Sequence, residues 1–220
     1  QRCMAISVAI FVGASKQWIP AIVEEAARLK VGPGNEGSSD VGPLISKAAK
    51  ERVEKLIQSG VDEGAELLLD GRNPSVATGF EDGYFVGSTV FRNVKKGMQI
   101  YDNEIFGPVL CCVEVDTYDE AIKFVNENQY GNGTAVFTRS GSAARKYVDQ
   151  IQAGQVGVNV PIPVPLPMFS FTGNKRSILG DMNFYGKAGV NFYTQLKTVT
   201  SAWRADHYVE QLSTAGVGAQ

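Results

Sequence analysis

The sequence predicts an α/β fold in which a mostly parallel sheet is flanked by helices on both faces. Strand-like and helix-like patterns alternate along the 220 residues, as they do in chains built from strand–helix–strand units. The strand-like runs are nearly continuous in apolar residues, which is typical of strands buried on both faces. A chain of this length can bury a substantial core as one large domain. Ligands of such sheets usually bind beyond the carboxyl ends of the strands.

The first half of the chain predicts strands from short β-branched or aromatic runs, and helices from apolar residues at helical spacing. In order, the expected elements are a strand at Ser7–Gly13, a helix at Gln17–Lys30, a Gly- and Ser-rich loop at 31–42, a helix from Ile45 to about Gly60, a strand at Glu66–Leu69 and an extended segment at Tyr84–Val90. Pro20 is compatible with the first helix because it falls in the first turn, where no helical hydrogen bond is lost.

The second half continues the alternation. In order, the expected elements are a strand at Val109–Val115, a helix that begins after Thr117, a strand at Gly133–Thr138, a helix capped by Ser142 and ended by Gly154, and a strand at Gln155–Val160. Thr117 and Glu120 have the spacing of a capping box, in which each side chain bonds to the backbone amide of the other residue.

Three segments near the end of the chain depart from this alternation. Every second residue from Pro161 to Pro167 is proline, so the segment 160–167 is predicted to be an extended connector. Its apolar flanking residues favour a buried segment over an SH3-type ligand. The segment Val190–Val199 alternates apolar and polar residues and predicts a late strand that pairs with another chain or a distant element. The segment 204–220 is predicted to be a mobile tail.

The composition limits the partners and the compartment. With 44% hydrophobic residues, 20% charged residues and a formal net charge of -2, the chain gives no reason to expect a nucleic acid or a membrane as a partner. The three cysteines are Cys3, Cys111 and Cys112. The last two are adjacent in a predicted strand, where neighbours point to opposite faces. An odd count in this arrangement argues against a disulfide framework and for a reducing compartment.

The sequence offers a single histidine and no obvious metal site. The single histidine is His207, in the predicted tail, so a Ser-His or Cys-His catalytic pair is not expected. No cluster has metal-ligand spacing. Two local features remain, and each has two readings. Glu104-Ile105-Phe106-Gly107-Pro108 places a carboxylate and a ring on a Gly-Pro turn, which suits either a flat, hydroxyl-bearing ligand or an ordinary loop capped by a core Phe. Cys3 precedes a strand and follows the cation Arg2, so it is either a nucleophile or a small buried hydrophobe.

Two of these segments carry a resemblance to a known family. Gln1-Arg2-Cys3-Met4-Ala5 resembles the catalytic-cysteine segment of the aldehyde dehydrogenase superfamily, and Glu104-Ile105-Phe106-Gly107-Pro108 resembles its cofactor-ribose segment. The likeness continues through Tyr130-Gly131-Asn132-Gly133 and through 154–159. It ends in 192–200, which is similar to the superfamily's oligomerisation strand.

One branch of that superfamily is especially similar. The run 161–173, Arg2 and the run 183–187 resemble the CoA-acylating methylmalonate-semialdehyde branch. Other members usually carry Pro-Phe-Gly-Gly where this chain has Ser170-Phe171-Thr172-Gly173.

The resemblance implies a role for four residues. Cys3 would attack the aldehyde and carry the acyl group as a thioester, and its backbone amide would help to hold the oxyanion. Glu104 would bind the ribose hydroxyls of NAD, and Phe106 would pack near the ribose and nicotinamide. Phe171 would line the aldehyde pocket. In this branch coenzyme A takes the acyl group and CO2 is lost, which gives propionyl-CoA from methylmalonate semialdehyde or acetyl-CoA from malonate semialdehyde.

The resemblance also implies a domain organisation. We expect an aldehyde-dehydrogenase-like catalytic domain at 1–189, an oligomerisation strand at 190–203, and a homo-oligomer, either dimer or tetramer. The cofactor-binding half would lie before Gln1, so we expect this chain to be the C-terminal half of an enzyme and to be inactive alone. The expected compartment is the mitochondrial matrix for a eukaryotic source and the cytoplasm for a bacterial one.

Two other functions stay open at this stage. One is an inactive, truncated interaction module that keeps the oligomerisation strand and binds full-length subunits. The other is a general, non-acylating aldehyde dehydrogenase, which would turn over without CoA.

Overall fold

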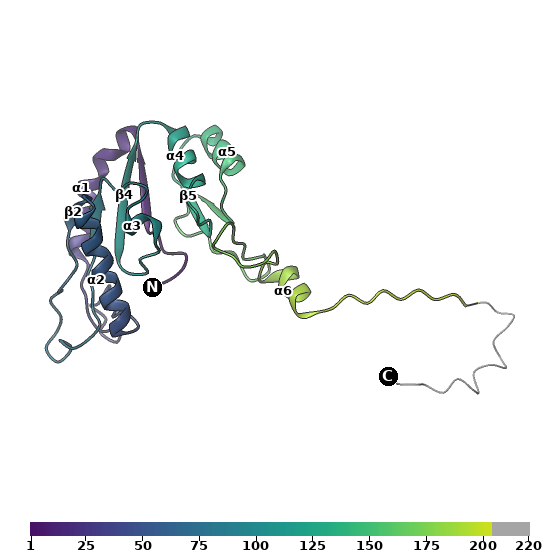
Figure 1. Ribbon diagram of the computed structural model, residues 1–220, viewed down its shortest axis with the longest axis horizontal. Coiled ribbons are helices and arrows are strands. Elements are labelled where there is room, and N and C mark those ends of the chain that lie inside the picture. Colours follow the sequence, from purple (N-terminus) through teal and green to yellow (C-terminus); the bar gives the residue numbers. More distant parts are fainter. Residues whose placement is uncertain (204–220) are drawn as a thin grey trace.

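The computed structural model of the protein describes residues 1–203 and contains two sheets with helices packed around them (Figure 1). The first sheet has the strand order β1-β4-β3-β2. Its strands are β1 (Val8–Val12), β2 (Glu66–Leu69), β3 (Thr89–Arg92) and β4 (Val109–Val115). Strand β4 is parallel to both of its neighbours, whereas β2 is antiparallel to β3. The predicted α/β fold with a mostly parallel sheet is therefore confirmed.

Helices cover both faces of the first sheet, as predicted. Helix α1 (Ile19–Arg28) packs on the face that contains Cys112, and helices α2 (Lys47–Asp62) and α3 (Gln99–Asp102) pack on the face that contains Cys111. The two adjacent thiols point to opposite faces because side chains alternate along a strand. The core of the domain therefore lies in two layers, one on each side of β4.

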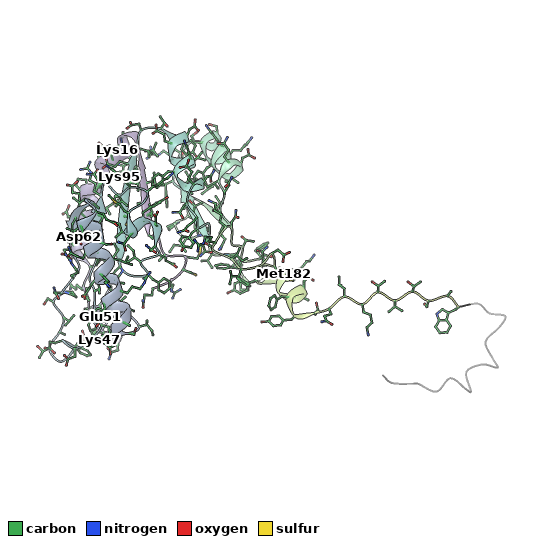
Figure 2. The ribbon with its side chains drawn as sticks, in the orientation of Figure 1. Lys16, Lys47, Glu51, Asp62, Lys95 and Met182 are labelled. Carbon is green, nitrogen blue, oxygen red and sulfur yellow. The ribbon has the colours of Figure 1, made fainter. Side chains whose placement is uncertain are left out.

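Helix α2 is the longest of the described helices and has a clear start signal. The Ser46 side chain accepts a hydrogen bond from the backbone amide of Ala49, which caps the helix. Lys47 and Glu51 form an ion pair one turn apart on its solvent side. Figure 2 shows these two side chains at one end of the helix and Asp62 nearer the other end. Between them, the buried face of α2 presents Val53 and neighbouring apolar residues to the sheet.

The second sheet pairs β5 (Gly133–Val136) with β6 (Gln155–Val158) in parallel. Helices α4 (Tyr118–Asn126) and α5 (Gly141–Gln150) lie beside it in Figure 1. They enclose a smaller core that includes the buried ring of Tyr147. Five of the six described strands thus take part in parallel pairs, and α5 connects β5 to β6, as the alternating pattern predicts.

Most strand and helix-cap predictions made from local sequence patterns are confirmed. Strand β4 has the predicted bounds, and both bonds of the Thr117–Glu120 capping box are present. Two helix starts differ. Residues 13–18 form a 3-10 helix, η1 (Gly13–Trp18), so α1 begins only at Ile19. Ser140, and not Ser142, caps α5, because its side chain accepts from the amide of Ala143.

The prediction of a strand over residues 190–203 is wrong in its first part. Residues 190–193 form the last turn of helix α6 (Gly186–Tyr193). A short alternating pattern fits a helix as well as a strand, and the backbone turns sharply into the helix at Tyr185, whose φ is 64°. Residues 194–203 are extended and run away from both sheets in Figure 1. The predicted tail at 204–220 lies outside the described residues, as does His207.

The proline-rich connector is extended, as predicted, but it is not buried. Its apolar side chains are about half exposed, with values of 49% for Val160 and 61% for Leu166. The connector follows β6, and its apolar side chains stay partly open to solvent. Within residues 1–203, no helix combines the length and the apolar character that crossing a membrane requires.

Candidate active site

The cysteine segment and the Gly-Pro turn lie at the same edge of the first sheet. Cys3 precedes β1, and Glu104–Pro108 precedes β4. Because β1 and β4 are parallel neighbours, with Val8 opposite Cys111, both segments lie at the amino ends of the strands. The expectation of a site beyond the carboxyl ends of the strands does not hold for these residues. The candidate site at this edge therefore rests on the family resemblance and not on the strand topology.

Cys3 is the exposed cysteine of the three. It lies in a turn that is closed by a hydrogen bond from the amide of Ala5 to the carbonyl of Arg2, at 3.0 Å. Burial raises the pKa of Cys111 to about 12 and that of Cys112 to about 11. Thiols with such pKa values stay protonated and unreactive near pH 7. The accessible thiol of this chain is therefore that of Cys3.

The Glu104–Pro108 turn packs against buried residues on one side and exposes a ring on the other. The Ile105 side chain is buried in the main core, while the Phe106 ring is 42% exposed. Phe106 has a φ of 58°, a backbone conformation that costs a bulky residue energy and needs support from its surroundings. Gly107 packs so closely on α2 that an added Cβ would lie 2.7 and 2.8 Å from the two Val53 methyl groups.

Side chains from two other segments bind the carbonyl groups of this turn. The Arg52 guanidinium of α2 donates to the carbonyls of Glu104 and Ile105, both at 2.6 Å. The Gln1 carboxamide donates to the carbonyl of Phe106 at 3.2 Å and accepts from the amide of Ile45 at 3.0 Å. Gln1 thus joins the cysteine segment directly to the turn and to the segment that leads into α2.

The other side of the cysteine segment contacts the second sheet. The Asn132 carboxamide donates to the carbonyl of Cys3 at 3.2 Å. The carboxamide nitrogen of Gln155, at the start of β6, lies 3.5 Å from the Met4 sulfur and donates to the carbonyl of Thr172 at 3.2 Å. This places the segment after Phe171 beside the residue that follows Cys3.

Phe171 is fixed in a small aromatic cluster. It forms an isolated antiparallel bridge with Phe184, with backbone hydrogen bonds of 2.8 and 3.2 Å. Its ring centroid lies 6.4 Å from that of Phe184 and 6.0 Å from that of Tyr185. The hydroxyl of the next residue, Thr172, donates to the carbonyl of Gly154. The half-buried Phe171 ring is therefore tied to the start of β6.

The structure brings the segments of the predicted site residues into one region, where the side chains of Gln1 and Gln155 bridge them. The segments of Cys3 and Phe106 meet through Gln1, and those of Cys3 and Phe171 meet through Gln155. Within residues 1–203 the Glu104 carboxylate makes no hydrogen bond or ion pair and is free to accept one. An exposed carboxylate beside an exposed ring suits the ribose hydroxyls and the flat ring of a dinucleotide. The same part of the chain contains no group of acidic, Cys or His side chains that could hold a metal ion.

Sequence reasoning missed the residues that support the site. The carboxamides of Gln1, Asn132 and Gln155 and the guanidinium of Arg52 were not singled out. Arg52 gives no sequence signal, because a charged residue on an amphipathic helix usually faces solvent. A stronger signal existed for Gln1 and Asn132, since both lie inside segments that carry the family resemblance.

A hollow elsewhere on the surface is separate from this site. It measures about 620 Å³ and lies between the end of α1 and the loop at 70–77. Neither Cys3 nor Glu104 lines it, and Phe171 lies outside it as well. The candidate site lies instead at the exposed edge of the first sheet, beside the amino ends of β1 and β4.

Replacing Gly107 with alanine is expected to displace the turn. The new methyl group would overlap the Val53 methyl groups, and such overpacking typically costs about 1–3 kcal/mol. In the full-length protein we expect a lower melting temperature and weaker binding of NAD. Adding Val53→Ala removes both methyl groups and should restore NAD binding. Gly141→Ala is the matched control, because nothing lies within 4 Å of its added Cβ. Wild-type NAD binding in Gly107→Ala would contradict the tight packing of this turn.

Comparison with known proteins points in one direction. A sequence model of the Aldehyde dehydrogenase family matches residues 1–199. A Bos taurus protein named acylating, mitochondrial methylmalonate-semialdehyde/malonate-semialdehyde dehydrogenase is 60% identical over 206 residues, which are 94% of this chain and 38% of the bovine protein. An Arabidopsis thaliana protein named acylating, mitochondrial methylmalonate-semialdehyde dehydrogenase is 59% identical over 204 residues, which are 93% of this chain and 33% of that protein.

Solved structures give the same picture. A putative methylmalonate-semialdehyde dehydrogenase from Sinorhizobium meliloti, complexed with NAD, matches with a TM-score of 0.89 and 45% identity, over 93% of this chain and 42% of that one. An aldehyde dehydrogenase of Mycobacterium tuberculosis, complexed with NAD+, matches with a TM-score of 0.81 and 33% identity, over 89% and 39%. The chain therefore spans between 33% and 42% of the length of each of these four relatives.

Proposed function

The chain belongs to the aldehyde dehydrogenase family, and on that premise we propose that it is the nucleophile-bearing part of an NAD-dependent, CoA-acylating methylmalonate-semialdehyde dehydrogenase. The observation that carries the proposal is the position of Cys3. It is exposed on a turn, and its segment is bonded through Gln1 to the turn that presents Glu104 and Phe106. The proposed nucleophile and the proposed dinucleotide-binding turn thus belong to segments that are bonded to each other, which supports oxidation through a thioester.

The proposed chemistry begins at the sulfur of Cys3. Its thiolate adds to the aldehyde carbon, and the former carbonyl oxygen becomes an oxyanion that the Cys3 backbone amide helps to hold. NAD, when bound, accepts the hydride from that carbon, which leaves a thioester on sulfur. The thiol of coenzyme A then takes the acyl group and Cys3 leaves as thiolate. The carboxylate of the acyl group leaves as CO2, and the α-carbon takes up one proton, which balances the proton that the CoA thiol gives up; the product is propionyl-CoA, or acetyl-CoA from malonate semialdehyde.

The other site residues bind and orient. Glu104 accepts hydrogen bonds from the ribose hydroxyls of the dinucleotide, and the exposed ring of Phe106 packs near the ribose and nicotinamide. Phe171 lines the pocket of the aldehyde. Its rigid attachment to Phe184 and to the start of β6 supports this role, because a fixed aromatic wall orients a small substrate at low entropic cost.

The proposal extends to the assembly and the compartment. Residues 1–189 act as the nucleophile-bearing catalytic domain, and the extended residues 194–203 pair with another subunit in a homo-oligomer. This segment has no strand partner within residues 1–203, and Leu196, Val199 and Trp203 expose most of their surface. A eukaryotic form acts in the mitochondrial matrix, in line with relatives that are named mitochondrial, and a bacterial form acts in the cytoplasm.

A dependence on coenzyme A tests this proposal. The full-length protein that contains this chain is supplied with methylmalonate semialdehyde and NAD, with and without CoA. We expect steady NADH formation only with CoA, and one NADH per site without it, because the thioester waits for a thiol. Steady turnover without CoA would instead identify a non-acylating aldehyde dehydrogenase. NADH absent in both assays, together with binding of this chain to full-length subunits, would identify an inactive interaction module.

A further inference from the structure

One residue outside the proposed reaction holds the cofactor-facing turn at two points. Arg52 lies in the first half of helix α2, and its two terminal nitrogens donate to the consecutive carbonyls of Glu104 and Ile105 at 2.6 Å each. Hydrogen bonds from a charged donor are shorter and stronger than neutral ones. The fixed fork of a guanidinium also sets the angle between the two acceptors. The pair of bonds therefore defines the orientation of both peptide groups.

The turn depends on such external bonds. Residues 103–106 have no regular secondary structure, and the carbonyls of Glu104, Ile105 and Phe106 all accept from side chains far away in the chain. Phe106 moreover has a φ of 58°, which the surroundings must maintain. Arg52 supplies two of the three bonds and comes from a rigid element, since its neighbour Val53 is 1% exposed in the core.

The guanidinium of Arg52 has no competing partner. Among residues 1–203 it forms no ion pair with a carboxylate, although α2 carries Glu51 and Glu54 beside it. Those two pair with Lys47 and Lys50 instead, at 3.8 and 3.9 Å. The guanidinium of Arg52 thus binds the Glu104–Pro108 turn, whereas Lys47 and Lys50 form ion pairs within α2.

We propose that Arg52 is a positioning residue for NAD: it fixes the backbone from which the Glu104 carboxylate and the Phe106 ring reach the cofactor. This inference rests on the proposed function of the site. Arg52 does not touch the reacting atoms. Its loss loosens the turn, so it weakens NAD binding more than it changes the reaction of Cys3 with an aldehyde.

The test compares three variants of the full-length protein. Arg52→Ala removes both bonds, and Arg52→Lys keeps the charge but replaces the two donating nitrogens with one. Lys55→Ala removes an exposed cation three residues further along the helix, whose ammonium forms no hydrogen bond or ion pair among residues 1–203. We expect Arg52→Ala to raise the KM for NAD about tenfold, as the loss of roughly 1.4 kcal/mol would do. Arg52→Lys should raise it about threefold, and Lys55→Ala should leave it unchanged. The KM for the semialdehyde and the rate of Cys3 alkylation should stay at wild-type values in all three.

The outcomes separate the inference from the proposed function. Wild-type protein without NAD-dependent oxidation overturns the function and the role of Arg52 with it. An active wild type, together with an Arg52→Ala variant whose KM for NAD equals that of Lys55→Ala, overturns only the role of Arg52. So does an equal rise in both KM values with a lower melting temperature, which indicates a purely structural role. If Arg52→Ala does not fold, Arg52→Lys decides, and an unchanged KM for NAD there overturns the role.

Discussion

Replacing Cys3 with alanine is expected to lower acyl transfer in the full-length protein by roughly a thousandfold or more, because the proposed thioester forms on its sulfur. The two remaining cysteines cannot substitute. Both are fully buried, and their raised pKa values keep them protonated at neutral pH. The measurement is NADH formation with CoA present, together with the mass of the trapped acyl-protein in its absence. Cys3→Ser should be almost as inactive, since an alcohol is a far weaker nucleophile here.

A second cysteine variant controls for the loss of sulfur itself. Cys112→Ala removes a thiol from the α1 side of β4 and leaves the site untouched. We expect it to lose some stability and to keep its turnover and its thioester. Full activity of Cys3→Ala would remove Cys3 as the nucleophile and, with it, the proposed chemistry.

Replacing Phe91 with alanine is expected to destabilise the protein by about 3–5 kcal/mol. Phe91 lies in β3 and is 0% exposed in the main core. Its ring tip lies close to Gly60 of α2, where an added Cβ would be 3.0 Å from it. The ring therefore fills the space between the sheet and α2, and the truncated side chain leaves a cavity that the neighbouring helix can close only in part. Unfolding in urea, followed by tryptophan fluorescence, measures the loss.

Phe137→Ala is the matched control for that substitution. The Phe137 ring follows β5 and is 62% exposed, so its removal should change stability by less than about 0.5 kcal/mol. A similar stability for the two variants would show that the packing of α2 on β3 contributes little to the fold.

Much of the fold could be predicted from local patterns. The apolar run of β4 and the capping box of α4 fix their elements because both signals depend on neighbours in sequence. Ser140 and Ser142 illustrate the limit of such signals. Both are good helix caps, and only the extended backbone at Ser140 decides between them. Residues 190–193 show another limit, since an alternating pattern over four residues does not exclude a helical turn.

The candidate site could be predicted only in part, for a different reason. Physical reasoning left Cys3 and Glu104 with two readings each, and the family resemblance chose between them. The supporting residues act across long separations in the chain. Arg52 lies 52 residues before Glu104, and Asn132 lies 129 residues after Cys3. No local pattern encodes such contacts, which arise from the packing of α2 and of the second sheet.

The segment from Gln1 to Met4 is bonded on both of its sides. Its first residue is bonded to the turn before β4, whereas Cys3 and Met4 contact Asn132 and Gln155 of the second sheet. The two sheets share no strand pairing among residues 1–203, so this segment connects two separately paired sheets. Because the segment is bonded on both sides, the backbone of Cys3 is held between the two sheets. In the enzyme that we propose, the position of the Cys3 sulfur relative to the Glu104 turn would then depend on how the two sheets pack against each other.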